Sequence, residues 1–525
     1  MKKYLYPAAL LLGFSFDILF WEKIPGISFS IFVVLSLAAG FFLIKAEKLR
    51  PAKASLVLLL PILFLSVMAF IRKEPFTSFL NVSLTLFWMA VLAMTYLGGQ
   101  WRSFGLADYI ANFFHLIGGM VTLPWLATSE KDPHQVQHAS QTWLKHAGPT
   151  LRGLLLAIPV LLLFTALFSA ADLVFAKRVS DVIANLNLEN LPEYLLRAVL
   201  IFLVAYFFSG IILHAAKRSD AIRLIGMEKP LVPTFLGFTE TTIILTGVLL
   251  LFSAFVIIQF EYLFFGQANI TLQGFTYAEY ARRGFGELVA VAVFSLALIK
   301  GLSTVAKLEP SRKAKAFSWL TCGLVALVLI ILVSAFQRLS LYEGAYGFSR
   351  LRAYAHVFII WLGILLMAAA IMEIARRQRA FANIALAVLF GFSVSLNLLN
   401  VDGFIAHSNI NRTGLGEKLD VSYLASLSSD ALPVLAENFS ANQLSPKIRE
   451  SIGAALVCIQ QNLEESPETQ KNWQSFHFST WNARRELQKM QPSLEGYQFQ
   501  EKNWPPTVTS PDGTEYACQN PVTFD

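Results

Sequence analysis

The sequence predicts an all-α, polytopic membrane protein, in which a bundle of about 11 transmembrane helices precedes a small, mainly helical extramembrane domain. Composition is the first reason. Of the 525 residues, 55% are hydrophobic and only 15% are charged, whereas a soluble domain carries about 25% charged residues. The second reason is that apolar stretches near the roughly 20 residues a spanning helix needs fill residues 1–400.

Eleven stretches meet this length and apolarity. They run approximately 4–20, 25–44, 54–71, 76–98, 150–171, 195–216, 235–260, 286–305, 317–336, 355–373 and 381–400. The stretch 104–127 is left out of the count, because Asp108 and Pro124 interrupt it and Trp101 and Trp125 flank it. These features are typical of an interfacial or re-entrant helix.

The charges between the spans predict an orientation. With the N-terminus inside, the cytoplasmic segments hold 21 Lys and Arg and the outer segments hold 11. Enrichment of basic residues on the cytoplasmic side is the standard signal, so we expect the N-terminus inside and the C-terminus outside. Lys2 and Lys3 before an apolar run imitate a signal peptide, but no small-x-small cleavage site follows, which predicts an uncleaved first helix.

Residues 401–525 form the predicted C-terminal extracytoplasmic tail, helical to about residue 490 and irregular afterwards. It holds 9 Lys and Arg against 15 Asp and Glu, whereas residues 1–400 hold 33 against 20. A basic membrane part favours contact with anionic lipid headgroups, and no basic-aromatic motif indicates nucleic acid. Cys458 and Cys518 can pair if the tail is extracytoplasmic; two unpaired thiols are the alternative.

The first of two unusual outer motifs covers residues 274–288. On a helix, Glu279, Arg283 and Glu287 fall at four-residue steps, which places Arg283 between two carboxylates on one face. Tyr280 joins that face. The motif therefore brings a cation, a phenol and two acids together at the predicted outer boundary of the membrane.

The second motif has five residues spaced by four, namely Arg338, Tyr342, Tyr346, Arg350 and Tyr354. They form one stripe if the segment is helical throughout, and Gly344 or Gly347 can break it. Two interpretations stay open for the pair of motifs. Arg and Tyr suit an anionic-ligand site, and they equally suit Arg–Glu ties beside an interfacial belt of Tyr.

Polar residues within spans are a further group, because burying them in lipid is costly. They are Asp17, Glu240, Lys300, Ser393, Asn397 and Asn400, and Asp402 follows the last of them. The first three lie near span ends, where snorkelling is the simpler account. The last-span residues share one face and should point into the bundle, either in interhelical hydrogen bonds or along a cavity wall.

The sequence predicts no cofactor and no metal site. It contains no phosphate-binding loop, dinucleotide fingerprint, His-Glu-x-x-His zinc motif or Gly-x-Ser-x-Gly elbow. His134 and His138 are four residues apart in a loop, but no third ligand accompanies them. We predict no catalytic residue from these patterns.

Four segments carry a resemblance to a known family: YARRGFGEL at 280–288, LYEGAYGFSR at 341–350, NVDGFI at 400–405 and LDVSYLASLSSDALP at 419–433. They resemble bacterial polytopic membrane proteins catalogued as a domain of unknown function, the 4153/4173 group. The resemblance covers about residues 150–435. It implies a multi-pass protein of a bacterial inner or plasma membrane, and it implies no activity, substrate or cofactor.

Three functions are compatible with these observations. The first, which the sequence favours, is binding or moving an anionic envelope ligand or lipid through Tyr280, Arg283, Glu287 and the second motif. The second is a sensor or scaffold that binds an envelope protein through its tail. The third, an enzyme acting on a lipid-linked phosphate, is the weakest, because neighbouring arginines lower the pKa that a glutamate base needs raised.

Overall fold

The structure is a computed structural model. It describes residues 2–129, 191–220, 232–264, 285–308, 311–413, 419–441, 444–465, 472–501 and 505–518, with scattered positions in 157–178 and residue 224. The chain divides into two compact units. The first holds residues 1–21, 38–49 and 115–217, and the second holds 22–37, 50–114 and 218–525.

Eleven helical segments of the described chain are long and apolar enough to cross a membrane, as the predicted fold class requires. They belong to α1 (Lys2–Phe20), α2 (Ile27–Ala46), α3 (Lys53–Leu56) with α4 (Leu59–Ile71), α5 (Pro75–Thr95), α6 (Leu106–Ser129), α9 (Leu191–Lys217), α10 (Phe238–Phe264), α13 (Phe285–Val305), α14 (Ser311–Tyr346), α15 (Arg350–Ile374) and α16 (Ala380–Leu399). A short 3₁₀ helix, η1 (Gln100–Ser103), precedes α6.

The membership of this set differs from the prediction at two places. The helix α6 meets the criteria for a span, although the sequence prediction left 104–127 out of the count. Its 24 residues run through Pro124, because neighbouring turns of a long helix can hold a proline that would end a short one. The predicted span at 150–171 lies largely outside the described residues.

In the first unit, α1 and α9 pack closely. Gly13 faces the backbone of Ile201, where a Cβ atom would overlap the Ile201 carbonyl. Small residues at such crossings let two membrane helices approach. Near the end of α1, the buried Asp17 accepts from Arg197 Nε at 3.0 Å and from Arg197 Nη2 at 2.6 Å. The charge of Asp17 near the end of this span is thus compensated by Arg197 of the neighbouring helix α9.

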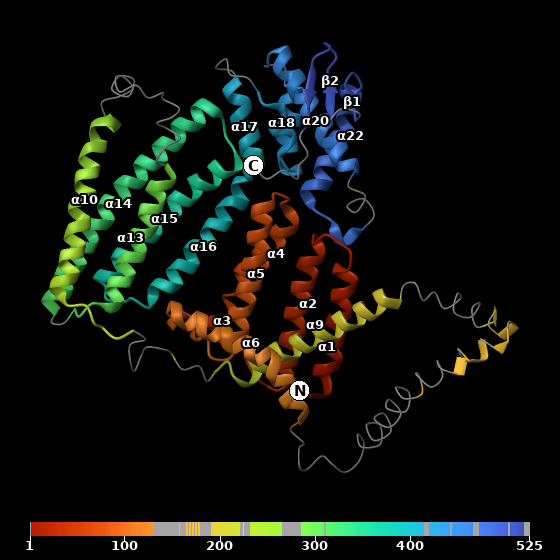
Figure 1. Cartoon of the computed structure of the whole chain (residues 1–525), viewed down its shortest axis with the longest axis horizontal. Coiled ribbons are helices and arrows are strands. Elements are labelled where there is room, and N and C mark those ends of the chain that lie inside the picture. The colour runs from red at the N-terminus through yellow and green to blue at the C-terminus, as the bar shows by residue number, and fades with distance from the viewer. Residues whose placement is uncertain are drawn as a thin grey trace. The chain divides into compact units, whose positions relative to one another are not determined.

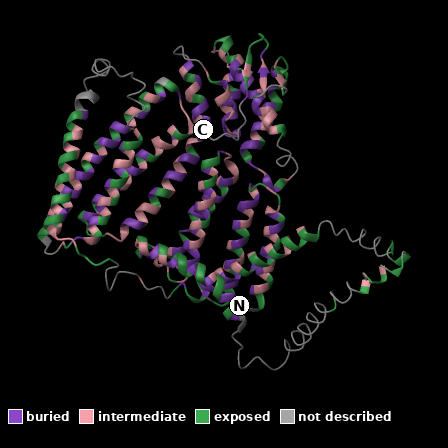
Figure 2. Ribbon diagram, viewed as in Figure 1, coloured by how far each residue is buried: buried purple, intermediate pink, exposed green. Residues whose placement is uncertain are grey.

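In the second unit, α10 and α13–α16 pack against their neighbours (Figure 1). The core of α10, α13, α14 and α15 is aliphatic, with Leu245, Ala292, Leu324, Val328 and Leu366 fully buried. Figure 2 shows exposed residues beside buried ones along α14, as expected of a helix with one face toward lipid.

The C-terminal domain, residues 401–525, follows α16 after Asn400, which has a left-handed backbone (φ 50°). Its elements are α17 (Val401–Thr413), α18 (Val421–Ala425), η3 (Ser429–Ala431), α19 (Leu432–Ser440), α20 (Pro446–Glu465), η4 (Trp473–Ser475) and α22 (Phe478–Leu494), followed by three strands. Its core includes Leu435 and Leu456 and continues into Ala353 of α15 and Leu396 of α16. The domain is therefore packed onto the ends of the spans.

The end of the chain differs from its predicted irregular structure. The strands β1 (Gln498–Gln500), β2 (Thr507–Thr509) and β3 (Glu515–Ala517) form an antiparallel sheet in the order β1-β2-β3. Phe499 pairs with Val508, and Val508 pairs with Tyr516. Each strand has only three residues around one apolar side chain, which is too short a run for period-two alternation to stand out among the turn residues.

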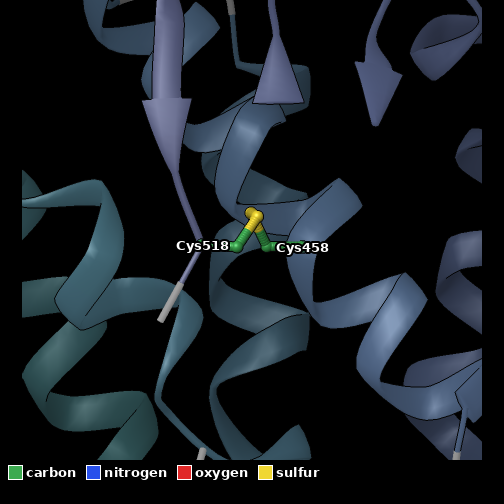
Figure 3. Close-up of a disulfide and its surroundings, with 2 residues drawn as sticks. All are labelled: Cys458 and Cys518. Carbon is green, nitrogen blue, oxygen red and sulfur yellow. A yellow bond between two sulfur atoms is a disulfide. The ribbon is translucent and has the colours of Figure 1, made fainter. Parts of the chain in front are cut away.

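A disulfide joins Cys458 of α20 to Cys518, which directly follows β3 (Figure 3). The two cysteines are 60 positions apart in the sequence and their Cα atoms are 5.6 Å apart. The bond closes the sheet onto the buried face of α20, where both cysteines are buried. Of the two alternatives for these thiols, the structure contains the paired one.

Reduction of this bond should weaken the C-terminal domain. Closing a loop of this length restricts the unfolded chain, worth roughly 4 kcal/mol in the chain-entropy account. We expect a Cys322→Ser protein, denatured without reductant, to take up no maleimide-polyethylene glycol, and to take up two labels after reduction. Gel mobility reads the count, and labelling of both cysteines before reduction would contradict the pairing.

Candidate functional site

The second motif of the sequence is split between two helices. The helix α14 ends at Tyr346, Gly347 turns the chain with φ 80°, and α15 begins at Arg350. A Cβ atom at position 347 would meet the side chains of Asn409 and Arg412 from α17, so the turn requires glycine on two grounds. Arg350 therefore leaves the stripe that Arg338 begins, which is the alternative with a break at Gly347.

The helix α17 holds this turn from the other side. Asn409 accepts from Phe348 N at 2.7 Å and donates to the Phe348 carbonyl at 3.0 Å. Arg412 Nη2 donates to the Gly344 carbonyl at 3.0 Å. A cation at the last carbonyls of a helix is favourable, because those groups carry partial negative charge.

The central contact of this region is the ion pair between Arg350 and Asp402. Arg350 Nε and Nη2 donate to the two carboxylate oxygens of Asp402, each at 2.8 Å. The Asp402 side chain is fully buried, and that of Arg350 keeps 25% of its surface. Two parallel charge-assisted hydrogen bonds fix the guanidinium in one plane.

Backbone groups of the C-terminal domain complete this ion pair. Arg350 Nη2 also donates to the Ser426 carbonyl at 3.1 Å, and Ser428 N donates to Asp402 Oδ2 at 2.7 Å. The backbone N–H of Arg350 itself donates to the hydroxyl of Tyr423 at 2.9 Å. The first turn of α15 is thus bonded to the segment between α18 and η3.

A second buried carboxylate, Glu74, lies at the start of α5. It caps this helix by accepting from Phe76 N at 2.9 Å and Thr77 N at 2.7 Å, and Pro75 occupies the first helical position, where its missing N–H costs nothing. Tyr354 of α15 donates its hydroxyl to the same carboxylate. Glu74 therefore ties α5 to α15.

A third carboxylate, Asp430 of η3, accepts from Lys73 N at 2.8 Å and Glu74 N at 2.9 Å. Arg72 Nη1 lies 3.7 Å from its other oxygen, and Arg72 Nε donates to the Asn397 carbonyl at 3.0 Å. Burial raises the pKa of Asp430, and the Lys73 N–H and the charge of Arg72 oppose that rise. Burial, with the charge of Arg484, lowers the pKa of the Lys73 amine.

We call this set the junction: Arg72, Glu74, Arg350, Tyr354, Asp402 and Asp430. It links the start of α5, the start of α15 and the start of α17 to η3. Each of its three acids is at most 4% exposed and each accepts a hydrogen bond from another element. Buried charges of this kind persist only when paired and hydrogen-bonded.

One family matches the chain across this region. A domain described as Domain of unknown function (DUF4153) matches residues 59–438. The chain belongs to this DUF4153 family. The match begins within α4 and ends within α19, so it includes every residue of the junction and excludes the disulfide. No curated protein and no solved structure matches the chain.

The polar residues of the last span meet a partner on α5. Asn81 and Asn397 exchange side-chain amide hydrogen bonds at 2.9 and 2.7 Å, and Ser393 Oγ lies 3.4 Å from Asn81 Oδ1. All three are fully buried. Asn400 instead donates to the Asp430 carbonyl at 3.1 Å. Of the two uses predicted for this face, the structure shows interhelical hydrogen bonds.

The remaining predicted residues of the two motifs lie on α13 and α14 or outside the described residues. Tyr280 and Arg283 lie outside the described residues, and Glu287 is exposed in the first turn of α13. The rings of Tyr342 and Tyr346 are in tilted contact with centroids 4.8 Å apart, and Arg352 lies over the Tyr342 ring at 4.2 Å. Arg338 is half-buried on the same helix.

Two span-end residues have local partners. Glu240 is exposed and accepts from Gly237 N at 2.5 Å, so it caps the start of α10. Lys300 donates to Gln378 Oε1 at 3.0 Å and lies over the ring of Phe381. Among the residues that the structure describes, no group of three or more His, Cys, Asp or Glu is arranged to hold a metal ion.

Sequence reasoning missed Glu74, Asp430 and Asn81 as members of these clusters. Glu74 precedes Pro75, a pattern of helix starts, so its capping role had a signal. Asp430 and Asn81 had none, because their partners are more than 300 positions away in the sequence. Only the fold brings them together.

Replacing one member of the central ion pair should destabilise the protein strongly. Arg350→Ala leaves Asp402 buried without its cation, which typically costs about 3–5 kcal/mol. We expect Arg350→Met with Asp402→Leu to recover much of the loss in thermal unfolding followed in detergent. Glu486→Ala, which breaks the exposed pair with Lys489, is the matched control and should change stability by less than about 1 kcal/mol. Equal losses in the single and double variants would contradict a direct pair.

Acidification should loosen the C-terminal domain through His477. Burial and the charge of Lys73 lower the pKa of this histidine from 6.5 to about 4, against a raising contact with the Ser475 carbonyl. The pKa of His477 is lower in the folded protein than in the unfolded chain, so the neutral imidazole favours the folded state above pH 6.5. This contribution of about 3 kcal/mol to the free energy of unfolding is lost as the pH falls to about 4. Thermal unfolding across this range should show a shallower loss in His477→Gln. An unchanged slope would contradict this role.

Proposed function

We propose that this membrane protein is a scaffold that holds its C-terminal domain rigidly outside the cytoplasm and presents it to an envelope protein. The observation that carries the proposal is the Arg350–Asp402 ion pair. In this pair, Asp402 binds the guanidinium of Arg350, a residue that the sequence pattern predicts as a candidate for ligand binding. Both carboxylate oxygens and the Ser426 carbonyl already accept from its guanidinium. Arg350 therefore has a structural role, in which it links the start of α15 to α17 and to the C-terminal domain.

The packing of the domain supports a role in presentation. Its core continues into Ala353 and Leu396 of the spans, so it cannot rotate freely on a linker. The junction adds three buried acids bonded to span ends. A domain fixed in this way keeps one surface at a constant height and orientation, which a scaffold or sensor needs and a tethered tail does not provide.

Two independent features support the outside location. The disulfide Cys458–Cys518 belongs to oxidising compartments such as the space outside a bacterial plasma membrane. The excess of Lys and Arg lies at the other ends of the spans, as at Lys307 after α13 and at Arg312 and Lys313 in the first turn of α14. We place the protein in a bacterial plasma membrane on this basis.

The membrane surface beside the domain is marked by aromatic residues. Ile27 N, at the start of α2, donates to the Phe476 carbonyl at 2.9 Å, so this segment lies level with the end of a span. Trp473, Phe478 and Trp481 around it are 45–58% exposed. Exposed aromatic rings at this level suit the lipid headgroup region, and we assign them to lipid contact.

The exposed charged residues of the domain are acidic in excess. The exposed acids include Glu437, Glu464, Glu465, Glu495, Glu501, Asp512 and Glu515, against exposed Lys447, Arg449, Arg485 and Lys489. An acidic surface steers a basic partner toward it and repels an acidic one. We therefore propose an envelope protein with a basic face as the partner.

Photo-crosslinking in the native cells tests the scaffold. A photoreactive residue at position 495 or 512 should give discrete protein adducts, identified by mass spectrometry. The same residue at Leu398, which is 68% exposed on a span, is the control and should give lipid adducts alone. Glu495→Lys with Glu501→Lys and Glu515→Lys should remove the protein adducts while the melting temperature stays the same. Lipid adducts alone at every position would refute the proposal.

A further inference from the structure

Three polar side chains meet where α14 and α15 approach each other near the turn at Gly347. Ser340 Oγ lies 3.2 Å from Nε2 of His356. On the other side of the ring, Nδ1 of His356 lies 3.1 Å from Glu343 Oε1. Serine, histidine and carboxylate thus follow one another in the order in which a nucleophile, a base and an orienting acid are arranged.

The fold brings these residues together by simple periodicity. Ser340 and Glu343 are three positions apart, so they share one face of α14, and the turn at Gly347 folds α15 back along that face. Phe336, one turn before Ser340, packs edge-on against the His356 ring with centroids 4.4 Å apart. The imidazole is therefore positioned by a ring as well as by polar contacts.

The environment of Glu343 decides the role of each ring nitrogen. Its side chain keeps only 3% of its surface, so a carboxylate there is stabilised by an N–H donor. Among the described residues Glu343 Oε1 makes no hydrogen bond, and Nδ1 of His356 is a polar atom 3.1 Å from it. A proton on Nδ1 faces this oxygen, and that tautomer leaves the Nε2 lone pair facing Ser340. The Ser340 hydroxyl proton then has two acceptors, Nε2 and the Phe336 carbonyl at 3.1 Å.

We propose that Ser340, His356 and Glu343 form an acyl-transfer site that hydrolyses a carboxylic ester of a membrane amphiphile. Ser340 Oγ attacks the ester carbonyl carbon while His356 Nε2 takes the hydroxyl proton. The tetrahedral intermediate collapses, the C–O bond to the alcohol breaks, and Nε2–H gives that alcohol its proton. Water, deprotonated by Nε2, then releases the acid from Ser340 and the proton returns to Oγ.

The substrate class follows from the position of Ser340 along α14. This helix has 36 residues, about 54 Å, whereas the hydrocarbon core is about 30 Å thick. Its apolar run ends at Phe336, and Gln337 and Arg338 follow. Ser340 is exposed, and Val333 and Leu341 beside it are 58% and 39% exposed. A group reaching this hydroxyl must lie where lipid tails meet headgroups, as the ester of a lipid does.

A cation is also present for the charge that develops on the carbonyl oxygen. Arg352 is four positions before His356, on the same face of α15. Its Nη1 donates to the Gly347 carbonyl and its guanidinium lies over Tyr342 at 4.2 Å. Stabilising a developing oxyanion with a fixed donor is often the largest part of acyl-transfer catalysis. We assign this role to Arg352.

A fluorophosphonate probe tests the site on the full-length protein in lipid nanodiscs. Peptide mapping should find the phosphonyl group on Ser340. Ser318 on the same helix also donates to its i−4 carbonyl, at 3.0 Å, and among the described residues no histidine is bonded to it. Ser318 is therefore the internal control and should stay unlabelled. His356→Gln should slow labelling by about 100-fold or more, and Glu343→Gln should slow it less.

Two results would overturn this inference. One is absence of label on Ser340 in the wild type. The other is equal labelling of Ser340 in wild type and in a His356→Gln protein with an unchanged melting temperature. Either would show that the three side chains only tie α14 to α15. A labelled wild type should also release p-nitrophenol from a medium-chain p-nitrophenyl ester, and Ser340→Ala should not. The scaffold proposal does not depend on either outcome.

Discussion

The ion pair between Arg350 and Asp402 is the contact on which the arrangement of the second unit depends. Arg350 begins α15 and Asp402 begins α17, so one pair fixes where two helices start. Because Asp402 is fully buried, the region can fold only when the cation and the Ser428 N–H reach it. Glu74 and Asp430 extend the same requirement to α5 and η3. A buried acid left without its partner costs more than any single aliphatic contact nearby would return.

This constraint changes the meaning of the outer arginines. In the sequence, Arg350 shares a four-residue spacing with Arg338 and three tyrosines, a pattern that suits a ligand site. In the fold, Gly347 interrupts that four-residue spacing, and Nε and Nη2 of the Arg350 guanidinium donate to Asp402 and to the Ser426 carbonyl. The same turn that removes Arg350 from the stripe brings His356 against Ser340 and Glu343. The turn at Gly347 thus separates Arg350, which holds helices together, from Ser340, Glu343 and His356, for which we propose a chemical role.

Much of the fold could be predicted from the sequence, and the site could not. Spans follow from apolar length, because the bilayer imposes one thickness on every helix, and the polar face of Ser393 and Asn397 followed from helical spacing. The contacts of Asp430 and of Asn81 could not be predicted in this way. Asp430 bonds to Lys73 and Asn81 to Asn397, and each pair is more than 300 residues apart in the sequence. The strands were not predicted, because runs of three residues are too short to show the period-two alternation of a strand. The sequence did not identify His356 as a candidate base, because its partners lie on another helix.

The central claim is that the Arg350–Asp402 pair locks the C-terminal domain to the spans as one cooperative structure. Hydrogen–deuterium exchange of wild type and Arg350→Ala at equal temperature tests it most directly. The account predicts that amides of α17, α18 and the first turns of α5 and α15 lose protection together in the variant, while α20 and its disulfide partner stay protected. Loss confined to the first turn of α15, with α17 and α5 unchanged, would contradict it.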